Sequence, residues 1–366
     1  MTTTALGIPL FGTRGRAAES TGLDTGDAGE RAARGSSPFL LDSHGRRAID
    51  LRVSLTDKCN LRCTYCMPAE GLDWLPGQEL LTDEELLRLI GIAVDRLGVS
   101  EIRFTGGEPL LRKGILGLVQ EVSRLKARPE ISLTTNGIGF ARRAADFAAA
   151  GLDRVNISLD TLDRDVFARL TRRDRHSDVI AALDGAVAAG LTPVKINAVL
   201  LRGVNDHEAG DLLAFAVERG YHLRFIEQMP LDAGHEWNRA SMVTADEIQE
   251  SLSRRFALTP HREARAGGPA ELFDVDGGPA TVGIIASVTR PFCGDCDRTR
   301  LTADGQIRNC LFSQSETDLR AMLRGTGTDD EIADAWRMAM WRKLPGHGIN
   351  DPSFLQPDRP MSAIGG

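Results

Sequence analysis

Cysteine is scarce in this chain, because six residues of 366 are too few to form a disulfide scaffold. The sequence also lacks any stretch close to the roughly 20 consecutive apolar residues that cross a bilayer. Between Met1 and Phe11 no basic residue precedes the short apolar patch, which Gly7 and Pro9 interrupt, so no secretory signal is expected. Clustered thiols without a disulfide framework indicate a protein of the reducing cytoplasm.

An excess of positive charge is missing as well. The formal net charge is −7, which argues against general nucleic-acid binding. The seven histidines are scattered and suggest no Ser–His–Asp triad. A polyanionic small ligand is still compatible with this charge, because distant charges are screened beyond ~8 Å and local cations decide binding.

The pattern of the chain changes twice along its length. Residues 1–45 are rich in small and charged residues without an apolar period, which predicts a disordered tail. Between residues 46 and 230 strand-like runs alternate with helical stretches, which predicts an α/β fold of the partial (β/α)6 TIM-barrel type. The rhythm weakens after residue 230, so residues 231–366 are expected to form a smaller C-terminal α+β domain. The predicted strands are Leu51–Thr56, Glu101–Thr105, Ile131–Asn136, Arg154–Asp160, Val194–Leu201 and His222–Gln228.

One face of the predicted strands is polar throughout. Successive side chains point to opposite faces. One face collects Val, Ile, Leu and Phe, whereas the other carries Arg52, Arg103, Thr134, Ser158 and Lys195. Barrel interiors are normally filled with Val, Ile and Leu. A barrel whose lumen holds a polar, anionic ligand explains the pattern; the alternative is an open sheet with one wet face.

The six cysteines form two triplets, C-x3-C-x2-C and C-x2-C-x13-C, made by Cys59, Cys63 and Cys66 and by Cys293, Cys296 and Cys310. An iron–sulfur cubane closed by protein alone takes four thiolates. Three thiolates leave one iron open to a substrate or cofactor. Zinc is the alternative for the first triplet, although closed zinc sites take four ligands and this loop has no histidine.

The segment Cys59-Asn-Leu-Arg-Cys-Thr-Tyr-Cys66 resembles the cluster loop of radical S-adenosylmethionine enzymes, and Phe104-Thr-Gly-Gly-Glu-Pro109 resembles their Gly-Gly-Glu motif. The resemblance implies a [4Fe–4S] cluster on the first triplet, whose open iron binds S-adenosyl-L-methionine. It implies that the cofactor is lined by Tyr65, Gly106, Gly107, Glu108, Ser158 and Met229.

The second triplet, within Cys293-Gly-Asp-Cys-Asp-Arg-Thr-Arg300, is similar to the second cluster site of the GTP-cyclising branch of that family, which acts early in molybdenum cofactor biosynthesis. The resemblance covers residues from about 42 onward and includes Thr134-Thr-Asn-Gly137 and the final Gly365-Gly366. It implies a lyase that converts GTP to 3′,8-cyclo-7,8-dihydro-GTP, with a second [4Fe–4S] cluster at the guanine base. It also implies that the tail ending in Gly365 and Gly366 reaches the active site.

The same resemblance assigns roles to individual residues. The substrate GTP would be bound by Arg52, Arg103, Thr134, Lys195, Arg298, Thr299 and Arg300, with Arg224 assisting. Catalytic roles would fall to Cys59, Cys63, Cys66, Arg298 and Arg300. Implied partners are a reductant protein that supplies an electron, the downstream cyclic pyranopterin monophosphate synthase and a second copy in a homodimer, with no nucleic acid and no membrane.

Two other functions are compatible with the sequence. One is a radical S-adenosylmethionine enzyme that modifies peptides and carries an auxiliary cluster, although such enzymes usually have more than three cysteines after the barrel. The other is a non-enzymatic iron–sulfur protein for electron transfer or cluster assembly, which would need neither a polar strand face nor a Gly-Gly-Glu turn.

Overall fold

The computed structural model describes residues 26–262 and 268–365. The chain divides into two compact units, residues 1–35 and 36–366. The described part of the first unit is one helix, α1 (Gly26–Arg34). In the second unit Leu40 and Asp42 are buried, at 0% and 2% exposed. Within the predicted tail, residues 26–34 are helical and residues 36–45 include these two buried side chains. Residues 1–25 lie outside the described residues.

The described strands form one twelve-stranded sheet in the order β12-β11-β10-β1-β2-β3-β4-β5-β6-β9-β8-β7. The first six strands in chain order match the six predicted strands to within about two residues. They are β1 (Asp50–Ser54), β2 (Glu101–Thr105), β3 (Glu130–Thr135), β4 (Arg154–Ser158), β5 (Lys195–Val199) and β6 (His222–Ile226). The remaining strands are β7 (Leu258–Pro260), β8 (Glu271–Val275), β9 (Thr281–Ile285), β10 (Arg298–Leu301), β11 (Gln306–Arg308) and β12 (Thr317–Asp318).

The C-terminal part extends the sheet at both edges. β9 pairs with β6 and β10 pairs with β1, both in parallel. Antiparallel pairs then add β8 and β7 on one side and β11 and β12 on the other. The predicted boundary near residue 230 thus divides the sequence but not the sheet, and the partial barrel has two more parallel strands than the six predicted.

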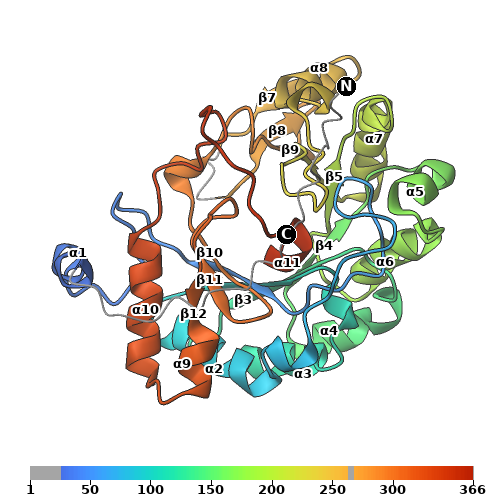
Figure 1. Ribbon diagram of the computed structural model, residues 1–366. Helices are drawn as coiled ribbons and strands as arrows, with labels where there is room; N and C mark the ends of the chain where they lie inside the picture. The colour runs from blue at the N-terminus through green and yellow to red at the C-terminus, as the bar shows by residue number, and fades with distance from the viewer. Residues whose placement is uncertain (1–25, 263–267, 366) are drawn as a thin grey trace, which may run out of the picture. The chain divides into compact units, whose positions relative to one another are not determined.

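Ten described helices follow the strands, and most of them cover the outer face of the sheet. They are α2 (Asp83–Asp95), α3 (Ile115–Ser123), α4 (Ala144–Ala150), α5 (Arg164–Thr171), α6 (His176–Ala188), α7 (Ala209–Arg219), α8 (Ala245–Ser253), α9 (Leu319–Arg324), α10 (Asp329–Trp341) and α11 (Met361–Ile364). Short 3-10 turns lie at 77–79, 109–111, 141–143, 206–208, 239–241 and 293–295. In Figure 1, α2 to α7 lie outside the strands, whereas α11 lies inside the space that the strands surround. No helix in the described ranges is long and apolar enough to cross a membrane.

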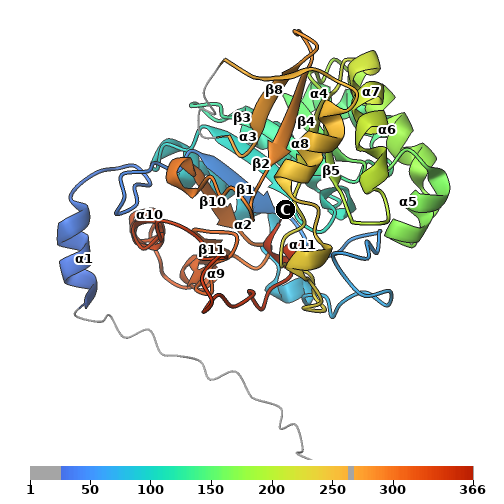
Figure 2. The ribbon, with the colours of Figure 1, turned by 90° about the horizontal axis from the view of Figure 1, so that it is seen from above.

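The apolar strand face packs under these helices and forms the core. Leu51, Val53, Ile102, Phe104 and Ile157 are all 0% exposed. Full burial of each such side chain stabilises the fold by about 2 kcal/mol. α2 begins as its sequence predicts, because Thr82 and Glu85 form a reciprocal capping box. On this same outer side, α10 contacts β11 and β12, and its Trp336 reaches Thr299 on β10 (Figure 2). The polar face is left for the lumen.

Candidate functional site

The first cysteine triplet lies in a loop at the carboxyl end of β1. Its three cysteines line a cavity of about 180 Å³ together with residues from the ends of β2, β3 and β4: Thr105, Gly106, Gly107, Thr134, Thr135, Asn136, Ser158 and Asp160. Loops at the carboxyl ends of barrel strands are where barrel enzymes place their chemistry. The structure thus brings the first triplet, the two glycines and Ser158 to one cavity.

Gly106 and Gly107 allow the cysteine loop to approach the end of β2. A Cβ on Gly106 would lie 2.4 Å from the carbonyl oxygen of Thr56, and one on Gly107 would lie 2.4 Å from those of Asp57 and Lys58. Gly106 also has φ +141°, which other residues rarely adopt. The glycines therefore fix the cysteine loop against β2 in addition to lining the cavity.

Glu108 does not line that cavity. Its carboxylate is 0% exposed and accepts hydrogen bonds from Thr135 Oγ1 (2.7 Å) and from the backbone N–H groups of Asn136 (2.7 Å) and Leu110 (3.0 Å). Burial raises the pKa of Glu108 to about 7, although these hydrogen bonds lower it. Glu108 thus holds the turn after β3, whose Asn136 Nδ2 lies 3.8 Å from Cys59 Sγ, and its contact with the cofactor stays a prediction.

Tyr65 and Met229 border a second, smaller cavity of about 60 Å³ that also reaches Cys66. The hydroxyl of Tyr65 donates to Asp160 Oδ2 at 2.8 Å. Burial raises the pKa of Tyr65 well above its usual value and that of Asp160 to about 6. Tyr65 lines both cavities, whereas Met229 lines only the smaller one.

Without a metal, burial keeps the thiols of the first triplet protonated. Burial raises the pKa of Cys59, raises that of Cys63 well above its usual value and raises that of Cys66 to about 12. Iron would displace these protons on binding. In the described residues no group of three His, Cys, Asp or Glu side chains is arranged to hold a single metal ion; a cubane instead takes each thiolate on a different iron.

A row of arginines crosses the polar face of three neighbouring strands. Arg52 lies beside Arg300 on β10 and beside Arg103 on β2, and Asp50 lies beside Arg298. The four arginines are 6% to 9% exposed. Like charges on adjacent strands destabilise a sheet. Asp50 offsets part of this repulsion, since its Oδ2 lies 3.7 Å from Arg52 and 3.6 Å from Arg103.

The charges of this row shift one another. Burial opposes ionisation of Asp50, but Arg103, Arg52, Arg298 and Arg300 together lower its pKa. Burial and Arg103 lower the pKa of Arg52 well below its usual value, and burial and Arg298 lower that of Arg300 to about 10. A second carboxylate, Asp297, lies 3.6 Å from Arg298. Two carboxylates do not balance four guanidinium groups, so the lumen is short of negative charge.

Buried polar atoms on this face lack hydrogen-bond partners among the described residues. They are Asp50 Oδ1, Arg52 Nε, Ser54 Oγ, Arg103 Nε, Asn156 Oδ1, Asn197 Oδ1, Arg298 Nε and Arg298 Nη2. Each buried atom of this kind costs about 1–3 kcal/mol. Donors exceed acceptors in this set, and a polyanionic ligand would supply the missing acceptors.

Further along the same face lie the other predicted substrate residues. Thr134, Asn156 and Lys195 are neighbours across β3, β4 and β5, and Arg224 lies on β6 beside Asn197. Burial, then Arg224 and other arginines, lower the pKa of Lys195 to about 7, and burial lowers that of Arg224 to about 10. Both cations therefore face the same shortage of negative charge.

Thr299 is a correction to the prediction. It lies between Arg298 and Arg300 on β10 and so points to the opposite face. It is 0% exposed, and its Oγ1 accepts a hydrogen bond from Trp336 Nε1 on α10 at 3.0 Å. Its side chain belongs to the core outside the lumen.

The second triplet lies at the opposite end of the strands from the first triplet. Cys293 and Cys296 immediately precede β10, whereas the first triplet follows β1, and these two strands are parallel neighbours. Cys310 follows β11, which is antiparallel to β10, so it returns to the same end. At about 3.3 Å per residue, the five residues of β1 put roughly 15 Å between the ends.

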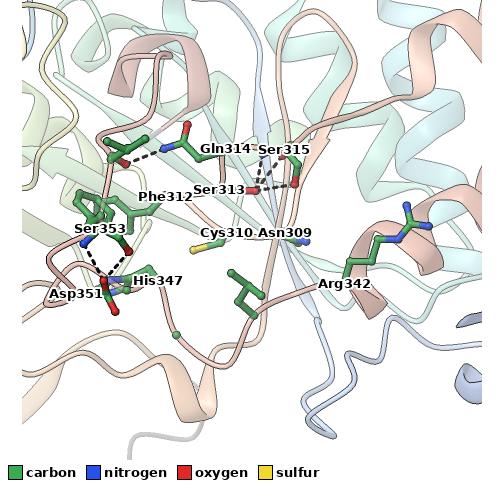
Figure 3. A pocket seen from close by; sticks show the side chains of 15 residues that line it. Asn309, Cys310, Phe312, Ser313, Gln314, Ser315, Arg342, His347, Asp351 and Ser353 are labelled. Carbon is green, nitrogen blue, oxygen red and sulfur yellow. Dashed lines mark hydrogen bonds between the residues drawn. The ribbon is translucent and has the colours of Figure 1, made fainter. Parts of the chain in front are cut away.

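The second triplet lines a cavity of about 70 Å³ with Arg298 and Arg300. Burial raises the pKa of Cys293. Burial alone would also raise the pKa of Cys296, but Arg298 and Lys343 lower it to about 7. Figure 3 shows a larger adjoining cavity of about 620 Å³, in which the Cys310 sulfur points toward Phe312 and His347. The site thus favours a thiolate at Cys296 and has open space beside it.

Helix α11 enters the lumen, as the resemblance implied for the tail. Met361 and Ser362 line the cavity of the first triplet, and Arg300 Nη1 donates to the carbonyl oxygen of Gly365. Gly365 has φ +90°, and a Cβ there would lie 2.9 Å from Thr105 Cγ2. Gly366 lies outside the described residues.

The sequence analysis missed three residues of the site. Asp50 stands one position before the predicted strand and shares the parity of Arg52, so extending the alternation by one residue would have found it. Arg154 has the parity of Asn156 and Ser158, and it pairs with Glu101 at 3.1 Å and with Glu130. Lys343, which donates to Cys296, left no signal because its contact is not local.

Comparisons with known proteins agree with this geometry. The Radical SAM superfamily model matches residues 53–216, and the Molybdenum Cofactor Synthesis C model matches residues 221–349. The GTP 3′,8-cyclase of Streptomyces coelicolor is 64% identical over 336 residues, which cover 92% of this chain and 98% of that protein. The GTP 3′,8-cyclase of Mycobacterium marinum is 58% identical over 370 residues, covering 100% of both chains.

Among solved structures, Streptococcus suis SuiB bound to S-adenosylmethionine matches with a TM-score of 0.55 and 15% identity, over 83% of this chain and 68% of that one. At this identity the likeness shows the fold alone. It agrees with the partial parallel barrel described above.

Proposed function

Because the chain belongs to the GTP 3′,8-cyclase family of radical S-adenosylmethionine enzymes, we propose that it cyclises GTP to 3′,8-cyclo-7,8-dihydro-GTP early in molybdenum cofactor biosynthesis. In this reaction C3′ of the ribose loses a hydrogen atom and bonds to C8 of guanine. One electron and one proton then complete the product, which is an isomer of GTP.

The observation that carries the proposal is the buried arginine row between two cysteine triplets. Arg298, Arg52 and Arg103 lie on three neighbouring parallel strands, β10, β1 and β2. A cation about 4 Å from a phosphate oxygen contributes roughly 4 kcal/mol at an effective dielectric near 20. Several such cations support binding of a triphosphate despite the net charge of −7.

The residues present fit two [4Fe–4S] clusters and S-adenosyl-L-methionine. Cys59, Cys63 and Cys66 would hold one cluster and the cofactor, and the second triplet would hold the other, each through three thiolates. When bound, the first cluster and S-adenosylmethionine supply a 5′-deoxyadenosyl radical that takes the hydrogen atom from C3′. Ser158, Tyr65 and the backbone of Gly106 and Gly107 would line the cofactor, as their place around the cavities supports.

The chain's own side chains position the substrate and exclude water. Arg52, Arg103, Arg298, Arg300 and Lys195 would hold the triphosphate, with Thr134 beside them. Holding the ribose against the radical source makes the transfer effectively unimolecular. Helix α11 fills lumen space next to the first triplet, which supports a role in keeping water from the radical.

The remaining partners follow from the same reaction. A reductant protein would supply the electrons, and a cyclic pyranopterin monophosphate synthase would receive the product. We place the reaction in the cytoplasm, where thiols are kept reduced. A homodimer stays a prediction.

An anaerobic incubation tests the proposal. Reconstituted protein is mixed with S-adenosylmethionine, reductant and GTP carrying deuterium at C3′, and the products are followed by mass spectrometry. We expect deuterium in 5′-deoxyadenosine and a cyclised isomer of GTP, both absent with Cys63→Ala. Formation of unlabelled 5′-deoxyadenosine without a new nucleotide would contradict the proposal and favour a peptide substrate.

A further inference from the structure

Arg46 links the loop after α10 to the second cysteine triplet. Arg46 Nη1 donates to the carbonyl oxygen of Cys293 at 2.5 Å, and its Nη2 donates to that of Leu344 at 2.6 Å. Arg46 is itself held by Asp42 at 2.5 Å. These contacts hold Leu344, and with it the preceding residue Lys343, beside the triplet.

Lys343 is a buried cation without a carboxylate partner in the part of the chain that the structure describes. It is 3% exposed. Its ammonium donates to the carbonyl oxygens of Arg298 (2.9 Å) and Cys296 (3.2 Å) and to Cys296 Sγ (3.2 Å). An ammonium has three donors, so all are used, and one is given to sulfur.

A lysine buried in this way is rare unless an anion pairs with it. Two neutral carbonyls satisfy its hydrogen bonds but do not neutralise its charge. A thiolate at Cys296 and the iron–sulfur group bound to it would supply the missing negative charge. The lysine thus has the placement of an outer partner that orients a metal ligand.

We propose that Lys343 is a positioning residue of the second cluster, which holds the Cys296 sulfur in its ligating orientation and raises the reduction potential of the cluster. The inference rests on the proposed function, because it requires a second [4Fe–4S] cluster on Cys293, Cys296 and Cys310. Hydrogen bonds to sulfur and nearby positive charge both favour the reduced, more negative cluster.

The test isolates the second cluster in the full chain by replacing Cys59, Cys63 and Cys66 with Ala. In this background Lys343→Met keeps the length of the side chain but removes its charge and donors, and Lys343→Arg keeps both. Lys126→Met, at an exposed lysine between α3 and β3, is the matched control. Iron content, the rate of iron loss to a chelator and the midpoint potential by paramagnetic resonance are measured after anaerobic reconstitution.

We expect Lys343→Met to lose iron about tenfold faster and to show a lower midpoint potential. Lys343→Arg should stay close to the parent and Lys126→Met should equal it. Unchanged retention and potential in Lys343→Met would overturn the inference. Faster loss with a raised potential would also overturn it, since that is the result of a loosened, more hydrated site. A parent chain that binds no cluster would overturn the proposed second cluster, and the inference with it.

Discussion

Lys195 shows how a single residue reports the shortage of negative charge in the lumen. Burial and the nearby arginines lower its pKa to about 7, against about 10.4 in an unfolded chain. Between these two values the unfolded state binds more protons than the folded one. The contribution of Lys195 to the stability of the ligand-free protein therefore rises with pH in this window.

Nucleotide binding should reverse that shift. A triphosphate beside Lys195 favours the charged lysine, so we expect GTP to bind with uptake of close to one proton at about pH 8.5 and with affinity that falls from pH 7 to 9. Calorimetry in two buffers of different ionisation enthalpy measures the uptake. Lys195→Met should bind more weakly and take up fewer protons. Equal uptake by both proteins would show that Lys195 does not meet the phosphates.

At the residue scale the sequence predicted the polar face but not all of its partners. Arg52, Arg103, Thr134, Ser158 and Lys195 could be placed because strand alternation is a local rule. Thr299 was misplaced, because the segment at 298–301 was not predicted as a strand and its parity could not be used. Its actual partner, Trp336, is 37 positions away, and such contacts leave no local pattern.

At the scale of elements, six strands were readable from sequence because each is a short alternating run closed by a helix. The pairing of β9 with β6 and of β10 with β1 was not readable. These pairs join residues far apart in the chain, and β10 is only four residues long. As a result the sequence predicted a partial barrel of six units and a smaller C-terminal domain, whereas that C-terminal part extends the sheet and adds Arg298 and Arg300 to its polar face.

The short helix α11 gives a test at this scale. Gly365→Ala puts a Cβ 2.9 Å from Thr105 Cγ2 at φ +90° and should displace the tail from Arg300. We expect cyclisation to slow by ten- to a hundredfold, because small misplacements in such sites are costly. Iron content and the unfolding midpoint should change little, since α11 spans four residues. Gly346→Ala, where no atom lies within 4 Å of the added Cβ, is the control. Unaltered turnover would mean that the tail is dispensable.

At the scale of the whole molecule, the two ends of the lumen should be separable by mutation. Cys63→Ala removes a ligand of the first triplet and should abolish S-adenosylmethionine cleavage. Arg298→Ala removes a cation at the opposite end and should weaken GTP binding by at least tenfold while slow, uncoupled cleavage continues. Production of 5′-deoxyadenosine and equilibrium binding of GTP are measured for both variants. Equal loss of cleavage in the two would contradict separate pockets.

Asp50 has a consequence for selectivity. In the ligand-free protein it is a carboxylate within 4 Å of both Arg52 and Arg103, and it also feels the charges of Arg298 and Arg300. The binding free energy that an incoming anion gains from these arginines is reduced by their existing attraction to the Asp50 carboxylate. A guanosine or monophosphate adds little beyond the resident carboxylate, whereas three linked phosphates outweigh it. The chamber can therefore sort nucleotides by how much charge they carry before their bases are read.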